Sequence, residues 1–358
     1  MKIKEKHFHS IWKDQEDKFC QIIDQRQLPH KLSIHQLHNS KDVFTAIREM
    51  YVRGAPLIGV TAAYGIYLAS LHTDSLAELN KVADYLKTAR PTAVNLEWAV
   101  DLLMEKISED YDSAQRIALE EANRIRTESI AECKSIGAHG LKIIEEIYKR
   151  NPDRPVQILT HCNAGWLACV DYGTATAPMY LAHDAGIPIH VWVDETRPRN
   201  QGARITAFEL GQHGIPHTLI VDNVGGLLMQ QKKVDLAIVG SDRTARNGDV
   251  ANKIGTYLKA LAACDNDVPF YVALPLSTFD LTLDSGVQIP IEERSPTEVE
   301  TVQGILNGKI EKVKISPEGT PTLNLGFDIT PAKFVTGLIT NKGTIKANEK
   351  EILKLFKQ

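Results

Sequence analysis

The stretch VQILTHCNAGWLACVDYG, residues 156–173, joins a short apolar run to a His-Cys-Asn-Ala-Gly turn. Apolar and β-branched residues over Val156–Thr160 predict a buried strand. The polar turn with Cys162 follows, and helical spacing over Trp166–Ala185 then predicts a helix. A strand, a polar turn and a helix in this order are typical of an α/β fold.

The same order of elements repeats toward the C-terminus. Further apolar runs, each predicting a strand, are Ile189–Val193, Thr218–Val221, Leu236–Val239 and Phe270–Leu274. Helical segments are predicted between them at Ala203–Gly214, Gly225–Lys232 and Val250–Ala263. Because these strands are rich in β-branched residues and do not alternate with polar ones, both faces of their sheet are predicted to be covered. The pattern predicts a parallel sheet with helices on both sides.

The first 150 residues have a different pattern. Short alternating runs over residues 1–48 predict a small antiparallel sheet, with turns at Asp14–Asp17 and Leu28–Pro29. Helices are predicted at 41–52, 55–71, 93–107 and 112–150, the last one broken near Gly137–Gly140. The NPDRP segment, 151–155, is the predicted joint. We therefore expect a mainly helical domain with a β-rich start over 1–150 and an α/β domain over 151–358.

Composition restricts the class of protein. An apolar fraction of 43% and a charged fraction of 24% are typical of a globular protein. The net charge of −4, with scattered Lys and Arg, argues against a nucleic-acid partner. The apolar segment Ala55–Leu71 is shorter than the ~20 residues that a membrane span requires and contains polar residues, so it predicts a core helix. The N-terminus contains no apolar run typical of a signal peptide, and five cysteines without a CxxC pair predict a reduced, cytoplasmic protein.

Polar residues follow every predicted strand of the α/β domain. In open sheets of this type, ligands bind beyond the carboxyl ends of the strands. Nearly all of the residues at these ends are polar, ionisable or disruptive to a strand: His161–Asn163, Asp194–Arg197, Asp222–Asn223, Gly240–Arg243 and Pro275–Thr278. Five successive strands that end in this way predict a ligand pocket.

Nucleotide cofactors and metals are not indicated. The turn after the first strand lacks GxGxxG, and the chain contains no GxxxxGK[ST]. The histidines of the α/β domain form no HxH or HExxH pair, so we expect no metal site and no cofactor. The chemistry would then depend on side chains alone.

Two side chains could perform that chemistry. Cys162 lies at the end of a strand and before a predicted helix, whose N-terminus would lower the pKa of a thiol. It could also be a buried apolar filler, as we expect for Cys169 on the same helix. Asp242 could act as a general acid with a raised pKa or could simply cap the next helix.

Cations and helix starts indicate a small anion. Arg53 and Arg90 lie at predicted helix starts, and Gly54 permits close approach of the backbone. Asn252 and Lys253 lie within the start of the predicted helix after Asp242, where backbone N–H groups and an ammonium group can hold an anion. Without a nucleotide motif, this combination predicts a small phosphorylated substrate.

Motifs distributed along most of the chain make a family recognisable. They are, in order, VRGAPLIGV (52–60), RPTAVNLEWA (90–99), LTHCNAG (159–165), DETRPRNQGARITAFEL (194–210), VGSDRTARNGDVANKIGTY (239–257), FYVALPLSTFD (270–280), IPIEERSPTEV (289–299) and FDITPAKFVTGLIT (327–340). With these motifs the chain resembles the methylthioribose-1-phosphate isomerases, relatives of regulatory subunits of a eukaryotic translation-initiation exchange factor.

The resemblance implies a helical N-terminal domain, a Rossmann-like C-terminal domain, a homodimer and no cofactor. It implies catalytic roles for Cys162 and Asp242. It also implies substrate contacts by Arg53, Gly54, Ala55, Arg90, Gln201, Asn252 and Lys253. Ser241 departs from the family pattern, in which alanine is usual at that position, and this hydroxyl beside the acid could alter substrate preference.

The implied reaction converts 5-methylthioribose 1-phosphate to 5-methylthioribulose 1-phosphate in methionine salvage. Two alternatives stay open. A sister isomerase would act on 5-deoxyribose 1-phosphate or ribose 1,5-bisphosphate, because the pocket for the C5 substituent cannot be located from the sequence. A non-catalytic regulatory subunit is the other alternative, and the presence of both Cys162 and Asp242 argues against it.

Overall fold

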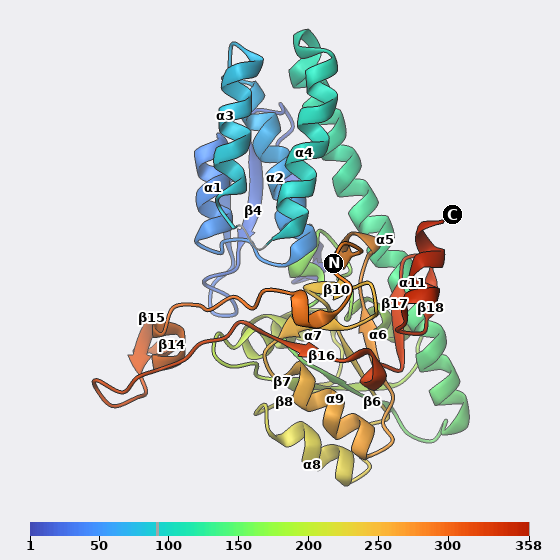
Figure 1. The fold of residues 1–358 in the computed structure, drawn as a ribbon. Coiled ribbons are helices and arrows are strands. Elements are labelled where there is room, and N and C mark those ends of the chain that lie inside the picture. The colour runs from blue at the N-terminus through green and yellow to red at the C-terminus, as the bar shows by residue number, and fades with distance from the viewer. Residues whose placement is uncertain (91–92, 358) are drawn as a thin grey trace. The chain divides into compact units, whose positions relative to one another are not determined.

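The computed structural model describes residues 1–90 and 93–357 and contains two compact units (Figure 1). Pro91 and Thr92 of the RPTAVNLEWA motif lie outside the described residues. The first unit comprises Met1, Glu5–Cys133 and Trp166–Gly173. The second comprises Lys2–Lys4, Lys134–Gly165 and the chain from Thr174 on. The expected domain boundary at residues 150 and 151 stays a prediction.

The first unit is mainly helical and contains a small antiparallel sheet, as predicted. Its sheet has the order β3-β4-β5, with β3 at Ile11–Lys13, β4 at Cys20–Asp24 and β5 at Ser33–Leu37. The helices that follow are α1 (Ser40–Arg48), α2 (Ala55–Ser70), α3 (Leu76–Lys87), α4 (Val94–Glu109) and the start of α5 (Ala114–Arg150). Helix α3 was not predicted. Short elements elsewhere in residues 1–113 are β1 (Lys2–Ile3), β2 (Lys6–His7) and the 3₁₀ helix η1 (Tyr111–Ser113).

Helix α2 forms the centre of the core of the first unit. Every residue from Leu57 to Ser70 is buried, which confirms the prediction of a core helix. Pro56 in its first turn suits the start of a helix, where the missing N–H has no helical partner. Across the described ranges 1–90 and 93–357, no helix combines the length and apolar character that crossing a bilayer demands.

Helix α5 corrects the prediction of a break near Gly137–Gly140, because it runs without interruption from Ala114 to Arg150. A Cβ atom on Gly137 would lie 2.9 Å from Leu181 Cδ1, and one on Gly140 would overlap the Pro178 ring. Both contacts are with α6 (Ala177–Asp184). The two glycines therefore permit close packing of α6 on α5 and do not end the helix.

A seven-stranded sheet dominates the second unit, and its order is β18-β17-β12-β9-β6-β7-β8. Its strands are β6 (Val156–Thr160), β7 (Ile189–Asp194), β8 (His217–Ile220), β9 (Leu236–Val239), β12 (Phe270–Ala273), β17 (Gly337–Thr340) and β18 (Gly343–Ile345). All neighbours are parallel except β17 and β18. From β17 to β8 the order is that of a Rossmann fold, and it reverses between β6 and β9. The predicted parallel sheet is thus confirmed, while β17 and β18 were not predicted.

Two predicted helices of the second half of the chain are wrong in extent. Residues Trp166–Ala185 contain only the 3₁₀ helix η2 (Trp166–Ala168) and α6. Residues Val250–Ala263 begin with a strand, β11 (Val250–Lys253), and only then form α9 (Thr256–Asp265). Strand β11 pairs with β10 (Arg243–Ala245) and β16 (Phe327–Thr330), and this pairing with residues far along the chain overrides the local helical pattern.

The predicted helices at Ala203–Gly214 and Gly225–Lys232 are present, with shifted bounds. The first consists of a π-helix, η3 (Gly202–Thr206), followed by α7 (Ala207–His213), and the second is α8 (Val224–Gln230). The remaining elements are η4 (Leu276–Thr278), β13 (Phe279–Asp280), η5 (Gly286–Gln288), α10 (Thr297–Glu300), β14 (Thr301–Leu306), β15 (Lys309–Lys314), η6 (Ala332–Phe334) and α11 (Glu349–Phe356).

Candidate functional site

The loops that contain Cys162 and Asp242 follow two adjacent parallel strands. In the β6–β9 pair Ile158 lies opposite Leu236, so both strands end at the same edge of the sheet. A Cβ atom on Gly240 would lie 2.5 Å from Ala164 Cβ, which shows that the two loops are in direct contact. The order of the sheet reverses between these two strands, and open α/β sheets bind ligands at such a point.

Cys162 has an unusual backbone conformation, with φ of 66°. Its N–H donates a hydrogen bond to Thr196 Oγ1 at 2.8 Å, and its carbonyl accepts one from Thr206 Oγ1 at 2.7 Å. The side chain is partly exposed. The helix predicted at Trp166–Ala185, whose N-terminus was expected to face Cys162, is reduced at its start to the three-residue helix η2, which follows a loop at residues 163–165. Side-chain hydroxyl groups, and not a helix start, surround the backbone of this cysteine.

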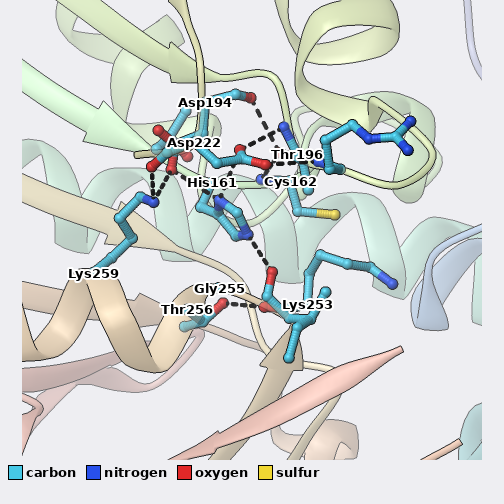
Figure 2. A network of polar contacts seen from close by, with 12 residues as sticks. His161, Cys162, Asp194, Thr196, Asp222, Lys253, Gly255, Thr256 and Lys259 are labelled. Atoms are coloured by element: carbon cyan, nitrogen blue, oxygen red, sulfur yellow. Dashed lines mark hydrogen bonds and ion pairs between the residues drawn. The ribbon is translucent and has the colours of Figure 1, made fainter. Parts of the chain in front are cut away.

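His161 links the loops on both sides of Cys162. Its Nδ1 lies 2.8 Å from Asp194 Oδ2, and its Nε2 lies 2.8 Å from the carbonyl oxygen of Ile254 (Figure 2). Both ring and carboxylate are buried. Lys259 Nζ lies 3.2 Å from the same Asp194 oxygen. This network joins the ends of β6 and β7 to the loop after β11.

Among the residues that the structure describes, two groups have ligand atoms close enough for a metal ion. In one, His161, Asp194 and Asp222 offer atoms within 4.8 Å of one another. Ligand atoms of this group already have partners within the protein. Asp194 Oδ2 lies beside His161 and Lys259, and the Asp222 oxygens accept hydrogen bonds from two backbone N–H groups. The second group is His7, His9 and Asp171. The absence of a metal requirement stays a prediction.

Asn252 and Lys253 lie in β11 and not at a helix start as predicted. Lys253 Nζ donates to the carbonyl of Gly326 at 2.8 Å and lies 4.7 Å from the centre of the Phe327 ring. The Asp242 N–H donates to Ala251 O at 2.9 Å, so β11 is held beside the loop of Asp242. In Figure 2 the Lys253 ammonium and the Cys162 thiol extend to the same side, away from the His161 network.

Asp242 is exposed and lies between β9 and β10. A strand follows it, so the alternative that it caps a helix is wrong. The Ser241 hydroxyl, which departs from the family pattern, lies 2.9 Å from Thr244 Oγ1. The expected raised pKa of Asp242 stays a prediction.

Gln201 precedes the π-helix η3 and is 7% exposed. Its Oε1 is buried and has no hydrogen-bond partner among the residues that the structure describes. Because an unpaired buried amide oxygen is unfavourable, a ligand that donates to this atom would stabilise the site.

The other predicted contacts belong to the first unit. Gly54 has φ of 92°, and a Cβ atom there would lie 2.6 Å from Ala168 Cα, so the backbone of Ala168 packs directly against this glycine. Its predicted close approach to an anion stays a prediction. Arg53 precedes it, and Ala55 begins α2. Arg90 follows α3 and is the last described residue before position 93. The approach of these four residues to Cys162 and Asp242 stays a prediction.

Sequence reasoning did not assign roles to several buried polar residues of the site. Thr196 and Thr206 contact the backbone of Cys162. Asn163 donates to Glu209 Oε2 at 3.0 Å, and Glu209 is almost fully buried. Position could have indicated Thr196, because it lies two residues after the end of β7, but Thr206 and Glu209 lie in helical segments that carry no such signal.

Comparison with known proteins identifies the family and the relatives of this chain. The model of the Initiation factor 2 subunit family matches residues 51–347. The chain is 55% identical over 360 residues to a methylthioribose-1-phosphate isomerase of Rhizobium meliloti (strain 1021), covering 99% of each.

Solved structures agree with this likeness. The crystal structure of 5-methylthioribose 1-phosphate isomerase from Pyrococcus horikoshii OT3 is similar with a TM-score of 0.87 and 37% identity, over 98% of this chain and 96% of that one. The structure of translation initiation factor eIF-2B, subunit delta, from A. fulgidus is similar with a TM-score of 0.83 and 35% identity, over 98% of this chain and 100% of that one.

Proposed function

The chain belongs to the Initiation factor 2 subunit family and is a relative of methylthioribose-1-phosphate isomerases, and we propose a function from this premise. We propose that the protein is an aldose–ketose isomerase. The substrate is 5-methylthioribose 1-phosphate and the product is 5-methylthioribulose 1-phosphate, in methionine salvage. The observation that carries the proposal is the pairing of β6 with β9, because Cys162 and Asp242 follow these two strands at the point where the sheet order reverses.

Asp242 is the proposed acid for ring opening. The aldose C1 carries both the ring oxygen and the phosphate oxygen, so the ring cannot open as it does in a free sugar. A proton delivered to the ring oxygen allows the bond between C1 and the ring oxygen to break, while the bond between C1 and the phosphate oxygen is retained. This role requires Asp242 to be protonated when the substrate is bound.

Cys162 is the proposed residue for hydrogen transfer. After ring opening, one hydrogen must move from C2 to C1, and the C2 hydroxyl must lose its proton to give the ketone. The thiol could carry this hydrogen as a proton through an enolate, or could stabilise the transition state of a hydride shift. Both routes require the sulfur to lie beside C1 and C2, and the partial exposure of Cys162 supports such access.

Basic groups are proposed to hold the phosphate so that it does not leave during ring opening. Lys253 is the candidate in the second unit, and its ammonium donates a hydrogen bond to Gly326 O. Arg53 and Arg90 are the candidates from the first unit, with Gly54 and Ala55 beside them. Gln201 and Asn252 are proposed to contact the substrate through their amide groups.

A direct assay tests the function. Purified protein is given 5-methylthioribose 1-phosphate, 5-deoxyribose 1-phosphate and ribose 1,5-bisphosphate in turn, and ketose formation is followed by NMR. We expect the methylthio substrate to have the highest kcat/KM. A higher kcat/KM with either other sugar would assign the chain to a sister activity, and no turnover with any would favour a non-catalytic role.

We propose a homodimer as the assembled form and the cytoplasm as its location. The dimer is an expectation that the motif resemblance implies, and it remains to be tested. The location is supported by five cysteines without a CxxC pair, which suit a reducing compartment. No nucleic acid is proposed as a partner.

A further inference from the structure

Two residues of the site that are neighbours in space share a rare backbone conformation. Cys162 and Thr196 both have φ of 66°, in the left-handed region. This region is unfavourable for residues with a Cβ atom, and most of all for a β-branched residue such as threonine. Residues persist in it only where their surroundings hold them, and they cluster at functional sites.

Two threonine hydroxyls hold the backbone of Cys162 from both sides. Its N–H donates to Thr196 Oγ1 at 2.8 Å, and its carbonyl accepts from Thr206 Oγ1 at 2.7 Å. Thr196 Oγ1 also donates to the carbonyl of Asp194 at 3.0 Å, so this hydroxyl is oriented with its lone pair toward Cys162. Both threonines are almost fully buried, where such bonds are not exchanged for bonds with water.

Thr196 is itself held by the loop after β8. The Asp222 carboxylate accepts the N–H of Thr196 at 2.7 Å and that of Arg197 at 2.8 Å. These contacts, visible in Figure 2, form a chain from Asp222 through Thr196 to Cys162. Three successive strand ends, those of β6, β7 and β8, therefore determine one backbone conformation.

We propose that Thr196 and Thr206 are positioning residues that hold Cys162 in its left-handed conformation and so fix the direction of its thiol. The proposal rests on the proposed function, in which the sulfur acts at C1 and C2 of the sugar. Without the two hydroxyls, Cys162 relaxes toward negative φ and its side chain turns away from the reacting atoms. A displacement of about 1 Å at a reacting group can lower a rate by roughly 100-fold.

The test compares Thr196→Val with Thr196→Ser. Valine has the shape of threonine without the hydroxyl, whereas serine retains it. We expect kcat of Thr196→Val to fall by about 100-fold with KM changed by less than about threefold, and Thr196→Ser to keep most of the activity. The crystal structure of Thr196→Val should show Cys162 at negative φ. Positive φ in that crystal, or equal kcat in both variants, would overturn the proposal.

A stability cycle tests the same point without reference to activity. Glycine tolerates positive φ and alanine does not, so Cys162→Gly should melt at a higher temperature than Cys162→Ala. In the Thr196→Val background this difference should vanish. Its persistence would show that the threonine does not impose the conformation.

The stability cycle remains informative if the wild-type chain turns over none of the sugars, which separates failure of the positioning role from failure of the proposed function. If Thr196→Val does not fold, Thr206→Val replaces it in both experiments, because its bond lies on the other side of the same cysteine.

Discussion

The five thiols of the chain differ in their access to solvent. Cys20, Cys133 and Cys169 are buried, whereas Cys162 is partly exposed and Cys264 is exposed. Burial raises the pKa of Cys20 to about 12. A hydrogen bond with Cys169, together with burial, raises the pKa of Cys133. These two thiols therefore stay protonated at neutral pH, and of the two more accessible ones only Cys162 lies at the end of a sheet strand.

Replacing either proposed catalytic residue should abolish turnover. We expect kcat of Cys162→Ser and of Asp242→Asn to fall by about 10²–10⁴ or more, because a hydroxyl is a much weaker acid than a thiol and an amide cannot supply the proton. Substrate binding, measured by calorimetry, should change little. Cys264→Ser is the matched control for thiol loss and should keep full activity. Undiminished turnover in either test variant would remove that residue from the mechanism.

At the scale of elements, the packing of α6 on α5 depends on two glycines. Gly140→Ala raises helix propensity but directs its new methyl group into Pro178. We expect a net loss of about 1–3 kcal/mol in the free energy of unfolding, measured by urea denaturation.

Gly226→Ala in α8 is the matched control for this experiment. Its new Cβ would meet Ala262 Cβ at 3.6 Å, an ordinary contact, so we expect stability to be unchanged or to rise by up to about 1 kcal/mol. Equal effects of the two substitutions would contradict the packing role of Gly140.

Helix α10 is tied to the loop after β7 by Glu298. Its carboxylate lies 2.9 Å from Arg294 and 2.6 Å from Arg199, and its side chain is 15% exposed. Burial raises the pKa of Glu298, but the hydrogen bonds and charges of the two arginines outweigh this and lower it to about 2. A lowered pKa in the folded state means that the ionised group adds stability above its ordinary pKa. That stability is lost as the pH falls from about 4.5 to about 2.

Glu298→Gln should therefore lower the free energy of unfolding by about 1–2 kcal/mol at pH 7, after allowance for screening by solvent. The difference from the wild-type protein should shrink between pH 4.5 and pH 2, as measured by chemical denaturation at each pH. Glu311→Gln, at an exposed position of β15, is the control and should match the wild-type protein throughout. A difference for Glu298→Gln that is independent of pH would show that packing, and not charge, is responsible.

At the scale of the whole molecule, the second unit exposes large apolar side chains that suit contact with another copy. Leu219 of β8, Leu227 of α8 and Leu258 of α9 are 48%, 51% and 61% exposed. Apolar side chains exposed on neighbouring elements are typical of association surfaces, and α8 and α9 contact each other.

Light scattering should give twice the mass of one chain at micromolar concentration. Leu258→Glu should raise the fraction of single chains, because a charge would be buried at the contact. Val287→Glu is the control, since Val287 is 92% exposed in a different element, η5. The mass of a single chain at every concentration would contradict the homodimer, and equal effects of the two variants would contradict this surface.

The local sequence pattern was sufficient to predict the main strands of the sheet and the residues that follow them. Val156–Thr160 and Leu236–Val239 match β6 and β9 at both ends, because short apolar runs with β-branched residues, bounded by turn residues, favour a buried strand over a helix. Cys162 and Asp242 could thus be assigned to strand ends. Motif resemblance added Gln201, which no local pattern indicated.

Tertiary structure alone decided which strand ends are neighbours. That β9 lies beside β6 depends on hydrogen bonds between residues almost eighty positions apart, which leave no mark on either segment. For the same reason Asn252 and Lys253 became part of a strand once β10 and β16 were paired with β11, and Gly140 stayed inside a helix once α6 packed on it. The left-handed backbone of Cys162 was likewise decided by the tertiary structure, since hydroxyls from two other segments maintain it.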